Sequence, residues 1–476
     1  MKEDDFLYLQ LANKLEQLII KGVYGVGERL PSVRELHQEH GVSISTALQV
    51  YAHLEKKGWI AARERSGYYV QLTPQQRLKL PAPSSPGPAA TQVKINDQVR
   101  RIREARHSRK TIPLDAPTPA TALLPHAKLH KALLQTVRAH QASDLQYSDL
   151  RGYEPLRRHI ARRCLTWKGM VTASDVIITN GAMEAMSFFL RAVAKPGDTI
   201  AIESPTFFGI LMSIESLGMK VLEIATDPVT GINLEKLEDA FRKKRVAACL
   251  LISNYNNPLG SCMPSANKQA LAALLHKYQV PLLEDDSFGE LHHGAERPAT
   301  VKTYDRDGWV LYCSSFSKSL SAGLRIGWAI PGSRFDYQVE QLKYTTTFHT
   351  SLLPQLAIHH YLEHQRLDLH LKQLRNALAI QTLQMARAIQ QYFPEDTALT
   401  QPEGGFNLWI VLNKKIDTWE LYQQALEHQI AVMPGSLFSS QQKYRNCLRV
   451  SSGIPWSEDL EWAVQTTGRL VKKLLK

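Results

Sequence analysis

The spacing of apolar side chains divides the chain into a short N-terminal part and a long C-terminal part. Near the N-terminus, Leu11, Leu15, Leu18 and Ile19 recur at helical spacing. Further along, short apolar runs alternate with segments long enough for helices, a pattern typical of a mainly parallel sheet covered by helices. The runs predicted as strands include residues 176–179, 246–252, 280–284, 310–313 and 447–450.

The N-terminal part also predicts two further helices and a hairpin. Ser32 and Glu35 form an S-x-x-E capping box, which predicts a helix that ends near His40-Gly41. Ser43 can cap the next helix, whose apolar face contains Ala47, Val50, Tyr51 and Leu54. Two short apolar runs around a charged tip, RERSG, predict the hairpin. A small helical interaction domain is the alternative, but this combination favours a winged helix-turn-helix.

Composition changes sharply after residue 71. The run LPAPSSPGPAA has no periodicity and predicts a flexible linker. The chain carries a net charge of +12, and residues 71–110 contain nine Lys/Arg against two Asp/Glu, whereas residues 1–70 contain nine of each. We therefore divide the chain into a DNA-binding domain (1–71), a basic Pro-rich linker (72–110) that can contact DNA phosphates, and a large domain (111–476).

Several classes of protein are not expected. The five cysteines have no CxxC spacing, which argues against a disulfide framework and against a structural zinc site, so no metal is expected. The first ten residues, MKEDDFLYLQ, lack the apolar run of a signal peptide. The chain also contains no run of about 18 apolar residues, the length needed to cross a membrane. These features predict a cytoplasmic protein without a membrane partner.

The run GERLPSVRELHQEHGVSISTALQVYAHLEKKGWIAARERSGYYV resembles the DNA-binding domain of the GntR family of transcriptional regulators. The resemblance implies that the protein binds double-stranded operator DNA. It implies DNA contacts from the second helix, the recognition helix and the wing: Arg34, Ser43, Ser45, Thr46, Arg63, Arg65 and Gly67. Ile44 departs from the pattern, because some relatives carry an arginine there.

The most informative chemistry lies in SSFSKSLSAGLRIGW, residues 314–328. The preceding apolar strand delivers Ser315, Ser317 and Lys318 at its C-terminal end, where ligands of open α/β sheets bind. A lysine there can form a Schiff base with an aldehyde cofactor, while two hydroxyls and the guanidinium of Arg325 suit a phosphate. The motif resembles the Schiff-base segment of fold-type-I enzymes that use pyridoxal 5'-phosphate (PLP).

That resemblance implies roles for further residues. Phe207 would stack on the cofactor ring, Asn257 would bond its phenolic oxygen, and Asp285 would hold its pyridine nitrogen protonated. Arg449 would grip a substrate or effector carboxylate, and Tyr147 would reach the phosphate of the partner subunit, which implies a homodimer. The implied cofactor site is Gly181, Ala182, Met183, Phe207, Asn257, Asp285, Phe288, Ser315, Ser317, Lys318, Arg325 and the partner's Tyr147.

Two positions depart from the pattern of active aminotransferases. Phe288 stands where many of them have a tyrosine that bonds the phenolic oxygen, and phenylalanine cannot make that bond. Ala182 stands where many have a serine or threonine.

A GntR-type winged helix joined to a fold-type-I aminotransferase-like domain resembles the MocR-like regulators. The resemblance implies an α/β PLP domain with a smaller C-terminal α+β subdomain. It also implies a regulator whose effector is PLP, or PLP joined to an amine or amino acid. The alternative is a working aminotransferase with a fused DNA-binding domain. A pure interaction scaffold would require an unreactive Lys318.

Overall fold

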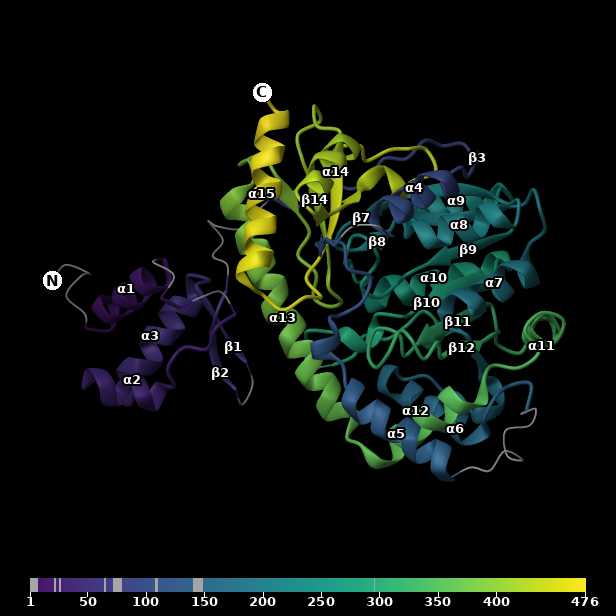
Figure 1. Ribbon diagram of the computed structural model, residues 1–476, viewed down its shortest axis with the longest axis horizontal. Coiled ribbons are helices and arrows are strands. Elements are labelled where there is room, and N and C mark those ends of the chain that lie inside the picture. Colours follow the sequence, from purple (N-terminus) through teal and green to yellow (C-terminus); the bar gives the residue numbers. More distant parts are fainter. Residues whose placement is uncertain are drawn as a thin grey trace.

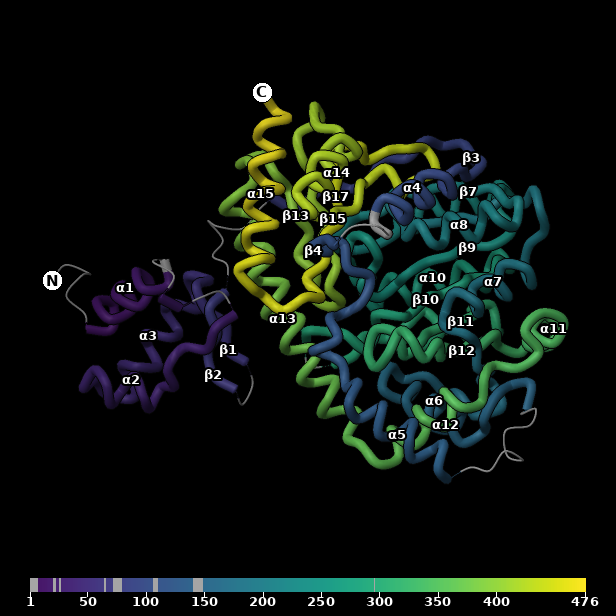
Figure 2. The backbone as a smooth tube through the Cα atoms, viewed as in Figure 1, coloured from purple at the N-terminus to yellow at the C-terminus, as the bar shows by residue number. Residues whose placement is uncertain are grey.

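The computed structural model describes residues 7–20, 23–24, 27–63, 66–71, 79–107, 110–139, 149–294 and 296–476. A small N-terminal domain lies beside a large α/β body, and the long helix α13 (Leu367–Tyr392) runs along the boundary between them (Figures 1 and 2). Among the described residues, no helix is both long enough and apolar enough to span a bilayer.

The N-terminal domain is a winged helix-turn-helix, as predicted. It contains α1 (Leu7–Ile20), α2 (Val33–His40), α3 (Ile44–Lys56) and an antiparallel hairpin of β1 (Ile60–Arg63) and β2 (Gly67–Val70). The capping box of α2 is present, with the Glu35 backbone N–H donating to Ser32 Oγ at 3.1 Å. The predicted cap of α3 is also present, because Ser43 Oγ accepts the Thr46 N–H at 3.0 Å. Leu36, Tyr51 and Leu54 close the core.

Residues 79–107 correct the prediction of a flexible linker over residues 72–110. Strand β3 (Thr91–Gln92) pairs with an edge of the large sheet, and helix α4 (Asn96–His107) follows it. Ile95 and Ile102 are buried in the main core, and Glu215 accepts the Ile95 N–H at 2.8 Å. These two apolar side chains and the strand pairing fix a segment whose proline-rich composition suggested freedom. Residues 72–78, 108 and 109 lie outside the described part of the chain.

The large body is built on a nine-stranded mixed sheet in the order β3-β7-β6-β9-β10-β11-β12-β5, with β8 paired to β7. The five strands from β7 to β11 are mutually parallel, and β12 is antiparallel to both of its neighbours. The strands are β5 (Ile177–Thr179), β6 (Thr199–Ser204), β7 (Lys220–Asp227), β8 (Gly231–Ile232), β9 (Ala248–Leu251), β10 (Leu282–Asp285), β11 (Val310–Ser315) and β12 (Gly327–Ile330).

Helices cover both faces of this sheet. Successive strand residues point to opposite faces, so their apolar side chains enter two separate cores. Leu283 and Leu311 enter one core cluster, whereas their neighbours Leu282 and Val310 enter another. The helices of the large body that precede α13 and follow α4 are α5 (His126–Ala139), α6 (Glu154–Cys164), α7 (Ala182–Val193), α8 (Phe208–Ser216), α9 (Leu234–Arg242), α10 (Ser265–Tyr278), α11 (Asp336–Tyr344) and α12 (Leu352–His364). Short 3₁₀ turns occupy Thr121–Leu123, Leu165–Trp167, Ala173–Asp175, Gly289–Leu291, Lys302–Tyr304 and Gly435–Phe438.

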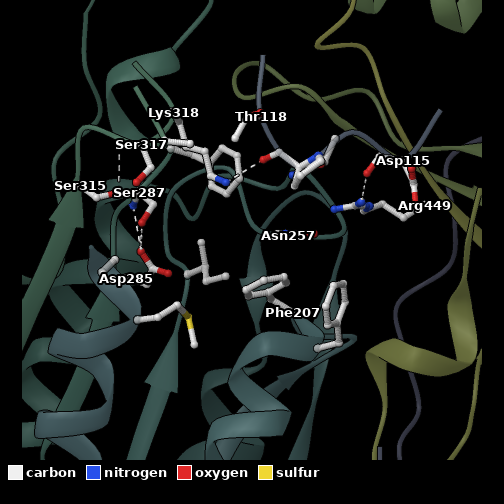
Figure 3. A pocket seen from close by; sticks show the side chains of 18 of the residues that line it. Asp115, Thr118, Phe207, Asn257, Asp285, Ser287, Ser315, Ser317, Lys318 and Arg449 are labelled. Atoms are coloured by element: carbon white, nitrogen blue, oxygen red, sulfur yellow. Dashed lines mark hydrogen bonds between the residues drawn. The ribbon is translucent and has the colours of Figure 1, made fainter. Parts of the chain in front are cut away.

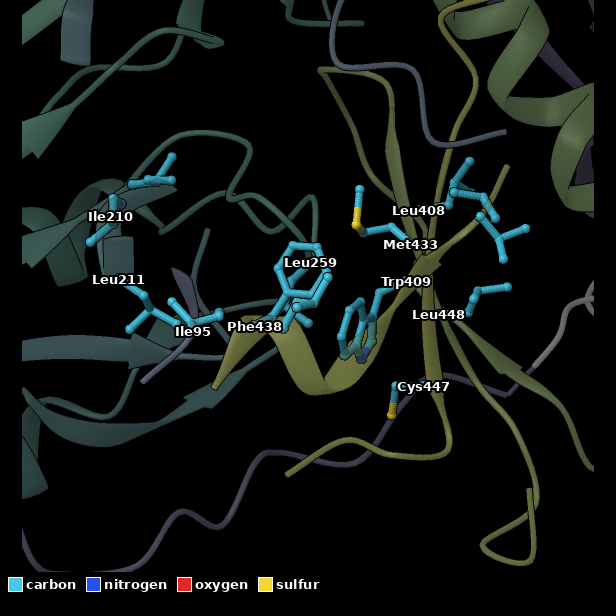
Figure 4. Close-up of a cluster of buried hydrophobic side chains, with 14 of the residues drawn as sticks. Ile95, Ile210, Leu211, Leu259, Leu408, Trp409, Met433, Phe438, Cys447 and Leu448 are labelled. Atoms are coloured by element: carbon cyan, nitrogen blue, oxygen red, sulfur yellow. The ribbon is translucent and has the colours of Figure 1, made fainter. Parts of the chain in front are cut away.

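A smaller α+β subdomain completes the C-terminal part. Its sheet has the order β13-β14-β17-β16, and Figure 4 shows its core side chains, among them Trp409 and Phe438, beside Leu259 of the large body. The subdomain is therefore packed continuously onto the large sheet. Its elements are β13 (Ala398–Leu399), β14 (Asn407–Val411), α14 (Thr418–Glu427), β16 (Met433–Pro434), β17 (Cys447–Ser451) and α15 (Glu458–Leu474), and β15 (Ile430–Ala431) pairs with β4 (Ile112–Pro113).

Helix α13 contacts both the winged helix and the subdomain within one turn. Gly27 lies against Ile380, and Leu383 packs on the core of the winged helix. Thr382 Oγ1 lies 2.7 Å from the Oγ of Ser452, the residue that directly follows β17. This turn of α13 therefore joins the two parts of the molecule.

Candidate functional site

A cavity of about 360 Å³ opens where the C-terminal ends of β10 and β11 face the smaller subdomain (Figure 3). Eleven of the predicted cofactor and effector residues line it: Ala182, Met183, Phe207, Asn257, Asp285, Phe288, Ser315, Ser317, Lys318, Arg325 and Arg449. Sequence reasoning missed other lining residues: Asp115, Pro117, Thr118, Phe208, Ile252, Ser287, Ala322, Asn407 and Met433.

Lys318 presents its amine to this cavity. Its Nζ donates to the carbonyl oxygen of Pro117 at 2.7 Å and lies 5.8 Å from the ring centroid of Phe288. Burial, reinforced by the positive charges of Arg449 and Arg325, lowers the pKa of Lys318 to about 8, although Asp285 opposes the shift. A neutral amine is the nucleophilic form, so this environment prepares Lys318 to attack an aldehyde near neutral pH.

The turn from β5 into α7 forms a cradle for an anion. Gly181 is the N-cap of α7, has φ of 85° and supplies no side-chain cap. Arg325 Nη2 donates to the Asn180 carbonyl at 2.8 Å, and a Cβ on Gly181 would lie only 2.4 Å from that nitrogen. A helix N-terminus beside a guanidinium and the hydroxyl of Ser317 suits a phosphate, and the glycine keeps the guanidinium close to the turn.

Two neighbouring carboxylates, Asp285 and Asp286, have different hydrogen-bond and ion-pair partners. Asp285 lines the cavity and accepts two hydrogen bonds from Ser287, from N–H at 2.9 Å and from Oγ at 2.5 Å. Burial raises the pKa of Asp285 even though these bonds lower it. Asp286 instead pairs with Arg297 at 2.6 Å and accepts the Tyr312 hydroxyl at 2.9 Å. Asp285 is therefore the carboxylate available to a cavity ligand.

Aromatic rings and an amide form the walls around Lys318. The ring of Phe207 is held in place beside Gly209, where a Cβ would lie 2.5 Å from it. Phe288 packs edge-on against Phe406 with centroids 5.5 Å apart. The Oδ1 of Asn257 is buried and has no hydrogen-bond partner among the described residues. An orphaned amide oxygen in a cavity wall indicates a place for a polar ligand atom.

The subdomain supplies the opposite wall through β14 and β17. Arg449 lies opposite Trp409 in the register, and Asn407 lies opposite Ser451, so Arg449 and Asn407 share one face of this sheet. Arg449 Nη2 donates to the Asp115 carbonyl at 2.6 Å. Figure 3 shows Arg449 and Asp115 across the cavity from Lys318.

The predicted DNA-contacting residues that the structure describes lie at three places on the winged helix: the start of α3, helix α2 and the wing. Ser43, Ser45 and Thr46 cluster at the N-terminus of α3, with Ser43 Oγ 2.7 Å from Ser45 Oγ and 2.8 Å from Thr46 Oγ1. Arg34 is exposed on α2, and Ile44 is half exposed beside the hydroxyl cluster. Exposed hydroxyls and a cation at a helix start are suitable for contacts with DNA phosphates and base edges.

In the wing, Arg63 is folded back. Its guanidinium lies 4.1 Å from the Tyr69 ring centroid, and burial lowers the pKa of Arg63. Gly67 has φ of 105° and lies close to the exposed Arg29, which sequence reasoning did not select. Arg29 forms an isolated antiparallel β-bridge with Tyr69, which places an exposed cation beside the wing. Arg65 and Tyr147 lie outside the described residues.

Comparison with known proteins decides the family. A model described as aminotransferase class I and II matches residues 111–465, and one described as bacterial regulatory proteins, gntR family, matches residues 7–70. The HTH-type transcriptional regulator YjiR of Escherichia coli is 38% identical, over 98% of this chain and 99% of that protein. The regulator YdcR of the same organism is 36% identical over similar shares, 98% and 99%. The chain belongs to the MocR-like family.

Solved structures agree with this assignment of the MocR-like chain. The α-aminoadipate aminotransferase LysN of Thermus thermophilus is 26% identical and superposes with a TM-score of 0.73, covering 79% of this chain and 95% of that chain. The large domain is therefore a fold-type-I aminotransferase-like domain.

PLP is the cofactor of this domain class, and the cavity of the MocR-like chain fits it. The cradle at Gly181 and Arg325 suits the phosphate, and the lysine of lowered pKa suits the aldehyde. Asp285, the unpaired Asn257 oxygen and the aromatic ring of Phe207 line the same cavity. A charged phosphate, a flat ring and an aldehyde thus each have a matching feature.

Proposed function

We propose that this MocR-like chain is a transcriptional regulator that holds PLP as a Schiff base at Lys318. PLP, or PLP joined to an amine or amino acid, is its effector. The observation that carries the proposal is the pairing of an amine of lowered pKa with an anion cradle in a protein that also carries a winged helix. Bound PLP supplies an aldehyde that condenses reversibly with primary amines and releases water.

Each residue of the cavity takes a separate part in holding the cofactor. Arg325, Ser315 and Ser317 line the cavity and would bind the phosphate together with the N-terminal N–H groups of α7, whose N-cap is Gly181. Asp285, Phe207 and Asn257 line the same cavity and would hold the cofactor ring, offering a carboxylate to the pyridine nitrogen, an aromatic side chain to the ring face and an amide to the phenolic oxygen.

The effector side of the cavity is formed by the smaller subdomain. Arg449 binds the carboxylate of an amino-acid effector bidentately, in place of its bond to the Asp115 carbonyl. The effector of a regulator must bind one arrangement of the protein better than another. The structure of LysN contains N-(5'-phosphopyridoxyl)-L-leucine, which supports a cavity of this fold accepting PLP joined to an amino acid.

The proposed assembly is a homodimer with two winged helices. Tyr147 acts from the partner subunit, and a two-fold axis would present both recognition helices to two half-sites of an operator. Sedimentation of the full chain measures this directly, and a monomer at micromolar concentration with full cofactor content would contradict the dimer.

Substitution of Lys318 tests the proposal. Reduction with borohydride is expected to attach PLP covalently to the wild-type chain at Lys318, as measured by mass spectrometry of peptides. Lys318→Ala should carry no label and should lose the response of operator binding to added amino acids, while Lys277→Ala, at a surface ion pair, should keep both. Labelling of Lys318→Ala equal to that of the wild type, or an unlabelled wild type, would reject the proposal.

Transamination is a second candidate, because Lys318, Asp285 and Arg449 line one cavity. Lys318 would then also move the proton between the substrate carbon and the cofactor. Phe288 weakens this candidate since it offers no hydroxyl to the phenolic oxygen. Steady-state turnover across amino donors, measured beside a gel shift on DNA upstream of the gene, separates the two. Rapid turnover without DNA binding would favour the enzyme.

A further inference from the structure

The side chain of Asn407 is buried in the cavity wall without a partner in the described part of the chain. Asn407 is only 2% exposed, yet both its Oδ1 and its Nδ2 lack hydrogen bonds to any described residue. The residue begins β14 and lines the same cavity as Lys318 and Arg449. Burying an amide without a hydrogen-bond partner is costly, so such groups are rare in folded proteins.

The surroundings of Asn407 do not explain an amide there on structural grounds. The residues that share its face of the sheet include Trp409 and Ser451, which are buried, and neither hydrogen-bonds the Asn407 amide. A leucine has nearly the same shape and would leave no polar group unpaired. The amide is therefore suited to a partner that arrives from the cavity.

We propose that Asn407 is a second anchor for the effector and selects effectors with a neutral polar side chain. This inference rests on the proposed function. Arg449 lies on the same face of the β14–β17 pair, so one molecule can reach both residues. An amide offers one acceptor and two donor hydrogens, which match a carboxamide or a hydroxyl. The effector class is an amino acid whose carboxylate binds Arg449 and whose side-chain amide or hydroxyl binds Asn407.

Pairs of amino acids with the same shape but different polarity test this selectivity. The PLP-loaded full chain is titrated with asparagine and leucine and with threonine and valine, and binding is followed by the change in cofactor absorbance. In at least one pair the wild type is expected to bind the polar member about tenfold or more tightly, because a site built for hydrogen bonds rejects analogues that lack them. Asn407→Leu should abolish or reverse that preference, and Asn267→Leu, at a surface helix, should keep it.

The preference is the ratio of the affinities of one variant for the polar and the apolar amino acid. This ratio does not depend on how much cofactor the variant carries. Thermal unfolding of the ligand-free protein adds an independent reading, since Asn407→Leu removes two unsatisfied groups and should raise the melting temperature. A lowered melting temperature would show that the amide has a structural partner and would reject the inference.

The possible results separate the two levels of the proposal. If amino acids bind but the wild type prefers no polar member, or if Asn407→Leu keeps the preference, the role of Asn407 is wrong while the proposed function stands. If no amino acid perturbs the cofactor of a protein that borohydride labels at Lys318, the amino-acid effector is wrong and the role of Asn407 falls with it.

Discussion

The winged helix and the cofactor cavity use polar side chains in opposite ways. At the start of α3, Ser43 and Ser45 are exposed, Thr46 is half-buried, and the Ser43 hydroxyl hydrogen-bonds the other two. In the cavity, Asn257 and Asn407 are buried with amide atoms that have no partner among the described residues. Exposed hydroxyls exchange water for DNA at little cost, whereas an amide buried in a cavity wall is positioned to hydrogen-bond a ligand. The winged helix therefore presents polar groups on an open surface, whereas the cavity presents buried ones.

The largest expected effect comes from crowding the phosphate cradle. Gly181→Ala places a Cβ 2.4 Å from Arg325 Nη2 at a backbone conformation of φ 85°. The Cβ should displace the Arg325 guanidinium, and loss of a charged hydrogen bond of roughly 1.5–3 kcal/mol should weaken PLP binding by about 100-fold. Titration of the apoprotein with PLP measures this affinity.

Gly197→Ala is the matched control for this change. Gly197 has φ of 91° but nothing within 4 Å of the added Cβ, so it tests the strain without the crowding. Equal losses of PLP affinity in the two variants would mean that the cradle is not specific to the phosphate.

The pH dependence of cofactor attachment sharpens the description of the cavity. Since the pKa of Lys318 is lowered to about 8, the protonated and unreactive amine dominates below that pH. The rate of PLP attachment to the apoprotein should therefore rise by about 50-fold between pH 6 and 8 and level off above 9. Stopped-flow absorbance gives the profile, with N-acetyl-lysine as a reference. A rate still rising steeply at pH 10, as for an ordinary lysine, would contradict a perturbed amine.

The DNA side of the comparison predicts a smaller effect of a different kind. Arg34→Ala removes an exposed cation on α2 and should weaken operator binding by about tenfold. The slope of log affinity against log salt should fall by about one, because one phosphate contact is lost. Fluorescence anisotropy at several salt concentrations measures both, with Arg138→Ala on α5 as the control. An unchanged salt slope would remove Arg34 from the phosphate contacts.

The smallest expected effect concerns the cap of the recognition helix. Ser43 Oγ accepts the Thr46 N–H, so Ser43→Ala should destabilise the winged helix by about 1 kcal/mol. Operator affinity should fall by about fivefold, and PLP affinity should not change. Ser43→Asp keeps the cap and separates capping from DNA contact, since it should restore stability but not DNA affinity. A fall in PLP affinity in Ser43→Ala would contradict independent sites.

Local sequence signals predicted those parts of the fold that local chemistry determines. The S-x-x-E box, the Ser43 cap and the apolar runs at 176–179 and 310–313 all correspond to observed elements. Residues 79–107 could not be predicted in the same way. Their order depends on pairing with β7 and on the burial of Ile95 and Ile102, contacts with residues more than one hundred positions away.

The residues of the candidate site also differ in whether local sequence could predict them. Residues in compact motifs, such as Ser315, Ser317 and Lys318, could be selected from the sequence and do line the cavity. Asn407 carried no such signal, because its meaning depends on the register of β14 with β17 and on the lack of a partner among the residues that the structure describes.

Helix α13 has a consequence for how the chain can vary. Ile380 and Leu383 meet the winged helix, and Thr382 between them meets Ser452. Each residue added to an α-helix turns the remainder of the helix by about 100° and advances it by about 1.5 Å. A single insertion between Ile380 and Leu383 would therefore rotate one of these attachments away from its partner. Insertions and deletions among relatives should therefore fall outside this turn of α13. The number of residues between these contacts fixes the position of the winged helix relative to the large body.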